Sequence, residues 1–166
     1  MIIFAHGLEG TPNGSKIQSL RNSGFEVLAP DFQGMPLIER VALLEKTSLD
    51  FAEKKPILAG SSYGGLTAAI VAMRFPERFS GLLLCAPALH LKEPPVADST
   101  ILVAPKGMPT VIIHGINDDV VPISCSIEYA EISGEDIIEF NKVLDGHRLS
   151  ESHNFILAGI EKLLAY

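Results

Sequence analysis

Cysteine is scarce in this sequence, which holds only Cys85 and Cys125. Two cysteines without a Cys-x-x-Cys pair argue against a disulfide framework and a zinc cluster, so we expect both thiols to be buried and reduced. His147 and His153 lie six residues apart, a spacing that does not bring two imidazoles to one face of a helix. Phosphate-loop and dinucleotide-binding glycine motifs are missing as well. The sequence therefore predicts neither a metal site nor a bound cofactor.

Positive charge is also in the minority, with 13 lysine and arginine residues against 20 aspartate and glutamate residues and a formal net charge of −7. We therefore expect neither nucleic acid nor an anionic membrane surface as a partner. No apolar run approaches the roughly 18 residues that a membrane-spanning helix needs. The chain opens on strand-like residues rather than on a secretory signal, which predicts a cytoplasmic protein.

The remaining composition is ordinary for a globular protein, with 47% hydrophobic and 20% charged residues. A length of 166 residues suits one domain with a sizeable core, so we expect a single domain over residues 1–166. Short apolar runs predict strands at residues 1–6, 25–29, 57–59, 81–85, 110–114 and 135–141. Helical periodicity predicts helices at residues 15–22, 37–54, 66–75 and 124–132 and from 152 onward, with Ser15, Ser124 and Ser152 as N-caps.

This alternation of strands and helices predicts an α/β fold. We expect a parallel sheet of six strands, with helices on both faces and right-handed crossovers. The carboxyl ends of parallel strands meet at one edge of such a sheet, and functional groups gather there. Reactive residues should therefore follow the predicted strands.

The segment 57–69 indicates a nucleophile, because it reads as a strand, a sharp turn and a helix around Gly60-x-Ser62-x-Gly64. A nucleophile at such a corner needs a tight, strained turn that lifts its hydroxyl clear of the sheet. Side chains two residues before and after it would clash, and glycine avoids the clash. The following helix also points its N-terminus at the reaction centre. The alternative is a βα loop that only turns the chain or binds a phosphate.

Two further strand ends supply a candidate acid and base. Asp118 follows the strand at 110–114 and could orient an imidazole, whereas an Asx-turn or helix cap is the simpler interpretation of Asp119. His147 follows the last predicted strand in a glycine-containing loop and is the best general base on offer. We expect His153 to lie a turn away, at the start of the last helix.

The first strand end offers backbone donors rather than a reactive side chain. His6-Gly7-Leu8 follows this strand, and its glycine lets the backbone approach a substrate. The N–H groups of Leu8 and Tyr63 could together hold a developing oxyanion. We expect His6 to be structural, and His114, which ends a strand, to be a buried scaffold residue. A plain βα turn is the alternative at residues 6–8.

Together these segments resemble the α/β-hydrolase superfamily. The resemblance is carried by His6-Gly7, by residues 60–65 and 114–122, and by Gly146-His147, and it covers nearly the whole chain. The order Ser62, Asp118, His147 matches the nucleophile–acid–base order of that fold. More narrowly, residues 6–16 and 60–65 resemble the small bacterial esterases of the YqiA type, although the acid loop departs from that group.

The resemblance implies a serine hydrolase that cleaves a small carboxylic ester or thioester through an acyl-enzyme. Ser62 would be the nucleophile, His147 the base and Asp118 its partner, with the N–H groups of Leu8 and Tyr63 as oxyanion donors. An acyltransferase or thioesterase with the same triad stays open, and so does a non-catalytic binding protein on this fold. The intact triad argues against the last of these.

The site is expected to be open, because only about residues 89–108 stand where such folds insert a lid. This predicts little or no lid and a preference for small acyl groups. Leu8, Phe32, Met35, Tyr63 and Leu89 are candidate pocket walls, and ordinary core or rim packing is the simpler interpretation of each. The natural substrate and the oligomeric state do not follow from the sequence.

Overall fold

A computed structural model describes residues 1–96 and 101–166 and contains one six-stranded sheet in the order β2-β1-β3-β4-β5-β6, with every neighbouring pair parallel. The strands are β1 (Ile2–Ala5), β2 (Val27–Leu28), β3 (Ile57–Ser61), β4 (Gly81–Cys85), β5 (Thr110–Gly115) and β6 (Ile137–Val143). The α-helices are α1 (Ser15–Asn22), α2 (Leu37–Asp50), α3 (Tyr63–Arg74), α4 (Ile123–Ser133) and α5 (His153–Ala165). The α/β fold with a six-stranded parallel sheet is therefore confirmed.

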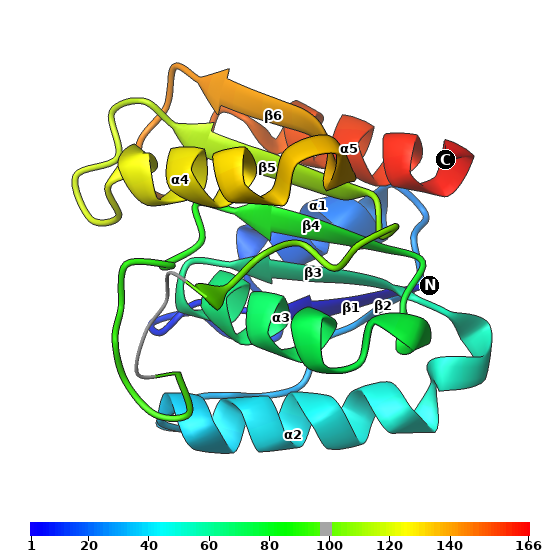
Figure 1. Ribbon diagram of the computed structural model, residues 1–166. Coiled ribbons are helices and arrows are strands. Elements are labelled where there is room, and N and C mark those ends of the chain that lie inside the picture. The colour runs from blue at the N-terminus through cyan, green and yellow to red at the C-terminus, as the bar shows by residue number, and fades with distance from the viewer. Residues whose placement is uncertain (97–100) are drawn as a thin grey trace.

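Helices cover both faces of the sheet, as expected (Figure 1). Helices α2, α3 and α4 pack on one face, and their apolar side chains join one buried cluster with side chains from the strands. Helices α1 and α5 pack on the other face, where Ile17 and Ile160 belong to a second cluster. The strand order reverses at β1, which lies between β2 and β3. A crevice for ligands is expected outside the carboxyl ends of the strands at such a point.

Several predicted element boundaries differ from the structure, among them the start of α3, which is Tyr63 and not residue 66. Only Val27 and Leu28 pair with β1, so the predicted strand 25–29 is much shorter as a sheet-edge strand. Strand β6 begins two residues later than predicted, because α4 ends at Ser133 and a short 3₁₀ turn, Gly134–Asp136, follows, in which the C-cap Gly134 has φ 62°. The helix predicted at 37–54 ends at Asp50, and a separate 3₁₀ turn, Ala52–Lys54, completes it.

The predicted helix caps also need correction. The N-cap of α1 is Gly14 and that of α4 is Pro122, so Ser15 and Ser124 lie inside their helices. Proline has a fixed φ and suits a position at the start of a helix. Ser152 is the N-cap of α5, but its hydroxyl donates to Asp145 rather than to the helix backbone.

No helix within residues 1–96 and 101–166 is long and apolar enough to span a membrane.

Candidate active site

Ser62 occupies the corner between β3 and α3 in a backbone conformation that non-glycine residues rarely adopt, with φ 56° and ψ −120°. The Ser62 N–H donates to the Cys85 carbonyl at 2.9 Å, and its own carbonyl accepts the Ala88 N–H at 3.0 Å. A Cβ atom at Gly60 would overlap the Gly64 carbonyl, and one at Gly64 would overlap the Ala5 carbonyl. The two glycines are therefore needed to let α3 start this close to the sheet.

The side chain of His147 joins Ser62 to Asp118. Its Nε2 lies 2.9 Å from Ser62 Oγ, and its Nδ1 lies 2.8 Å from Asp118 Oδ2. The carboxylate accepts a proton from Nδ1, which leaves Nε2 to accept the hydroxyl proton of Ser62. The three side chains come from the loops after β3, β5 and β6, at the carboxyl edge of the sheet.

Asp118 is held as a buried carboxylate. Its Oδ1 accepts the N–H groups of Val120 at 2.9 Å and Val121 at 2.8 Å. Burial by itself raises the pKa of Asp118, but hydrogen bonds from Val121, His147 and Val120 outweigh it and hold that pKa below its ordinary value. Asp119 is exposed beside the cleft. The turn-forming role that the sequence suggested for Asp119 therefore belongs to Asp118.

His114 is the buried residue that the sequence predicted. Its Nδ1 lies 2.8 Å from Ser126 Oγ on α4, and its Nε2 lies 3.1 Å from the Val121 carbonyl and 3.2 Å from Asp118 Oδ2. Burial lowers the pKa of His114, which favours its neutral form. A neutral imidazole that donates from Nε2 and accepts at Nδ1 fits all these contacts.

His6 and His153 do not contact Ser62. His6 is buried, with Nδ1 2.8 Å from the Gly7 carbonyl and Nε2 accepting the Phe32 N–H at 2.9 Å, so it supports the loop as predicted. His153 begins α5, and its buried Nε2 has no hydrogen-bond partner among the described residues.

The backbone N–H groups of Leu8 and Tyr63 are available beside Ser62. Both residues line the cleft that contains Ser62 and His147, and neither N–H donates to another group in the described part of the chain. Gly7 lies so close that a Cβ atom there would be 4.0 Å from Ser62 Oγ. Unpaired N–H groups on residues that line a cleft are potential hydrogen-bond donors to a ligand bound there.

The cleft over Ser62 is open and has a volume of about 990 Å³. Leu8 and Tyr63 contribute to its walls, as predicted. Phe32 and Met35 do not, because Phe32 is fully buried in the core and Met35 packs against that core. Leu89 is also a wrong prediction for this cleft, since it lines a separate hollow.

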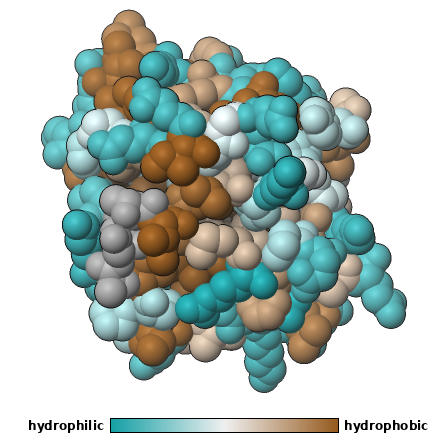
Figure 2. All heavy atoms as spheres, in the orientation of Figure 1, coloured by the Kyte–Doolittle hydropathy of each residue, from teal (hydrophilic) through white to brown (hydrophobic). Residues whose placement is uncertain are grey.

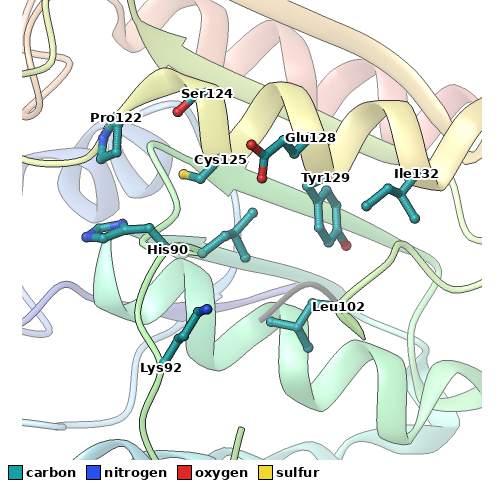
Figure 3. A pocket seen from close by; sticks show the side chains of 10 residues that line it. His90, Lys92, Leu102, Pro122, Ser124, Cys125, Glu128, Tyr129 and Ile132 are labelled. Atoms are coloured by element: carbon teal, nitrogen blue, oxygen red, sulfur yellow. The ribbon is translucent and has the colours of Figure 1, made fainter. Parts of the chain in front are cut away.

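That separate hollow, of about 270 Å³, lies between α4 and the segment after β4 (Figure 3). Tyr129 points from α4 toward Leu102. Cys125, one helical turn before Tyr129, lines the same hollow. His90 lines both this hollow and the cleft over Ser62. In the space-filling view, apolar side chains gather in the middle of this face, bordered by hydrophilic ones (Figure 2).

Sequence reasoning missed the contacts that hold the loop of His147. The Asp145 carboxylate accepts the N–H groups of Gly146 at 2.7 Å and Glu151 at 2.9 Å, and the Ser152 hydroxyl at 2.8 Å. A second contact joins α1 to the loop, where Lys16 Nζ donates to the Arg148 carbonyl at 2.6 Å. The Asp-Gly pair before His147 signals a turn but does not reveal these partners.

No group of three or more His, Cys, Asp or Glu side chains within the two described ranges could hold a metal ion.

Comparison with models of known protein families gives one match, and this match includes the turn at Ser62. A model of the Alpha/beta hydrolase family matches residues 2–131. This chain belongs to the α/β hydrolase family. The matched region contains Ser62 and Asp118 and ends before His147. A comparison with curated protein sequences gave no match.

Solved structures agree with this assignment. A protein from Xanthomonas campestris pv. campestris, provisionally described as a hydrolase of the α/β superfamily, is similar with a TM-score of 0.81 and 26% identity, over 99% of this chain and 97% of that one. Est1E from Butyrivibrio proteoclasticus, solved with ferulic acid, has a TM-score of 0.76 and 18% identity, over 99% and 87%. A monoacylglycerol lipase from Paleococcus ferrophilus has a TM-score of 0.73 and 18% identity, over 99% and 93%. The last two likenesses establish the fold alone.

Proposed function

We propose that this protein is a serine hydrolase that cleaves a small carboxylic ester or thioester through an acyl-enzyme. The observation that carries the proposal is the position of His147, within 2.9 Å of the Ser62 hydroxyl and 2.8 Å of the Asp118 carboxylate. A hydroxyl, an imidazole and a carboxylate in this order activate serine as a nucleophile on several unrelated folds.

In the first half-reaction, Ser62 Oγ attacks the acyl carbon while His147 Nε2 takes the hydroxyl proton. Asp118 keeps the imidazole in the required tautomer and stabilises the imidazolium. The tetrahedral oxyanion accepts the N–H groups of Leu8 and Tyr63, and removing one such donor typically costs about 3 kcal/mol of barrier. His147 then gives its proton to the leaving alcohol or thiol. Water, deprotonated by the same imidazole, releases the acid and restores Ser62.

The open cleft supports a small substrate. The segment between β4 and β5 is short for an independent helical lid, so little would enclose a long acyl chain. Two proteins of this fold are consistent with an ester substrate: Est1E, which was solved with ferulic acid, and a protein named as a monoacylglycerol lipase. The likeness of residues 6–16 and 60–65 to YqiA-type esterases favours the same class of substrate.

Reaction with a fluorophosphonate probe tests the activated serine without knowledge of the natural substrate. We expect the wild-type protein to be labelled and Ser62→Ala to lose both labelling and hydrolysis of p-nitrophenyl acetate. A protein that only binds ligands on this fold would not be labelled. Turnover retained by Ser62→Ala would reject Ser62 as the nucleophile.

A comparison of two histidine variants tests the base. His147→Ala should lose nearly all esterase activity, because Ser62 would have no proton acceptor. His153→Ala serves as the control, since His153 begins α5 and does not contact Ser62. The opposite result would transfer the role of the base to His153. Assays of the unlabelled wild-type protein with thioesters and with alternative acyl acceptors would separate hydrolysis from acyl transfer.

A further inference from the structure

Arg40 on α2 is a fully buried cation close to the proposed site, with 0% of its surface exposed. It lies on the inward stripe of α2, three residues after Leu37 and four before Leu44, where helical periodicity calls for an apolar side chain. No carboxylate in the described ranges lies within ion-pairing distance of it. Burial of an unpaired charge is costly, so a residue of this kind calls for an explanation.

The guanidinium donates to three backbone carbonyls. Nη1 lies 3.0 Å from the His6 oxygen, Nη2 3.5 Å from the Gly7 oxygen and Nε 3.1 Å from the Met35 oxygen. Burial lowers the pKa of Arg40, but a guanidinium titrates so far above neutral pH that it stays charged. The buried charge is thus solvated by peptide dipoles, two of which belong to the loop after β1.

The same guanidinium also stacks on aromatic rings. Its Cζ lies 4.8 Å from the centroid of the Tyr63 ring and 5.6 Å from that of Phe32. Contacts at these distances are attractive, because the ring face carries negative charge density. Arg40 therefore contacts Tyr63, the first residue of α3, as well as the loop after β1.

These two contacts reach the two residues that supply the proposed oxyanion donors. The Gly7 carbonyl and the Leu8 N–H belong to one peptide group, so a cation at that oxygen polarises the N–H at the other end. The Gly7 oxygen also faces Nδ1 of His6 at 2.8 Å and accepts the Gly10 N–H at 3.1 Å. Tyr63 supplies the second N–H, and its ring packs against the same guanidinium.

We propose that Arg40 is a positioning residue for the oxyanion hole: its buried cation fixes the peptide of Leu8 relative to Tyr63 and stabilises the negative charge that develops beside them. In a site of low dielectric, a fixed charge near the oxyanion acts more strongly than it would in water. This inference rests on the proposed serine hydrolase function.

A purely structural role is the competing explanation, since Arg40 also ties α2 to the loop after β1. Arg78 provides a matched control. Its Cζ lies 3.7 Å from the Phe75 ring centroid, and its Nη1 donates to the Glu45 carbonyl at 3.0 Å and to Ser48 Oγ at 3.1 Å. Arg78 thus has a stacked guanidinium and a backbone partner, but these contacts are with α2 and Phe75 and not with the loop after β1 or Tyr63.

The test measures kcat and KM for p-nitrophenyl acetate, together with inhibition by a boronic acid, in Arg40→Lys, Arg40→Met and Arg78→Met. We expect Arg40→Met to lower kcat by roughly 10- to 100-fold, by analogy with the loss of oxyanion donors, with KM changed much less. Boronate affinity should fall in parallel, because the boronate adduct imitates the tetrahedral anion. Arg40→Lys keeps the charge but not the two-pronged geometry, so it should fall between wild type and Arg40→Met.

The Arg78 control separates an effect of Arg40 on the oxyanion hole from a general loss of protein stability. Arg78→Met should lower the urea midpoint while kcat stays within twofold of wild type. If Arg40→Met does not fold, Arg40→Lys decides the question with the same measurements. Wild-type kcat and boronate affinity in a folded Arg40 variant would overturn the inference and leave the proposed function intact. Failure of the wild-type protein to react with fluorophosphonate would instead remove the proposed function and this inference with it.

Discussion

The imidazole of His114 lies behind Asp118, with its Nε2 3.2 Å from the same carboxylate oxygen that His147 approaches to 2.8 Å from the cleft. One carboxylate oxygen is therefore shared by two histidines, one fully buried and one partly exposed. The buried imidazole has no contact with solvent, so it cannot take up a proton without a cost to the fold.

We predict that stability falls in mild acid because of His114. Burial lowers the pKa of His114 in the folded state. In mild acid the unfolded chain is therefore protonated at His114 while the folded chain is still neutral there. The free energy of unfolding should be constant above about pH 7.5 and should decrease as the pH falls through about 6.5, the ordinary histidine pKa. The slope contributed by one such group approaches about 1.4 kcal/mol per pH unit. Urea titrations between pH 8 and pH 5 measure it.

Two histidine variants serve to assign this slope. Asparagine at position 114 removes the titrating group, so His114→Asn should flatten the pH dependence, even though it also lowers stability at pH 8. His90 is exposed, and His90→Asn should leave the slope as it is in the wild type. The half-buried ring of His153, whose pKa burial also lowers, should contribute to the slope that remains. A wild-type stability that is flat down to pH 5 would contradict the prediction.

The neighbouring carboxylates Asp118 and Asp119 should differ sharply in their effect on catalysis. Asp118→Asn removes the acceptor that fixes the tautomer of His147 and should lower kcat by about 10⁴-fold, as in serine proteases with this arrangement, with little change in KM. Asp119→Asn is the isosteric control on an exposed side chain and should stay within threefold of wild type. Steady-state assays with p-nitrophenyl acetate measure kcat and KM for both variants. Equal losses of kcat in the two variants would contradict the assignment of Asp118 as the partner of His147.

The backbone at Ser62 is strained, and its relief should be measurable as stability. Ser62 has φ 56°, which glycine adopts without a Cβ penalty, so Ser62→Gly should be more stable than Ser62→Ala by about 1 kcal/mol. Gly64→Ala should do the reverse and cost about 3 kcal/mol or more, since its Cβ would overlap the Ala5 carbonyl. Gly146→Ala is the matched control, because its Cβ would meet nothing nearer than 3.9 Å. Urea midpoints rank the four variants, and equal midpoints for Ser62→Gly and Ser62→Ala would exclude strain there.

Periodicity and strand ends were enough to predict most of this fold. Buried strands such as β4 are continuous apolar runs, and the turn at Ser62 needs glycines at two fixed positions. Both features can therefore be predicted from a few consecutive residues. The short strand β2 was harder, because only Val27 and Leu28 pair with β1, and local residues do not specify where this pairing stops. The caps at Gly14 and Pro122 were missed for a similar reason: several nearby residues could each start the helix.

The contacts around the site show where sequence reasoning stops. Arg40 lies on the apolar stripe of α2, which was visible in the sequence, but a long charged side chain at such a place can also reach solvent. Only the three-dimensional packing shows that its guanidinium ends against Tyr63. In the same way, Phe32 and Met35 follow a strand end, but they turn inward, so the sequence assigned them to the cleft wrongly.

Asp145 gives a last prediction, about the loop that carries His147. Its carboxylate accepts three hydrogen bonds from within residues 146–152, so Asp145→Ala leaves those donors without their partner and frees the loop. We expect kcat to fall by roughly 10-fold or more, because small displacements of a catalytic group are costly. Asp136→Ala is the control. Asp136 accepts the Gly107 N–H at a distance of 2.7 Å, and neither residue lines the cleft. Unchanged kcat in Asp145→Ala would mean that the loop keeps His147 in place without this carboxylate.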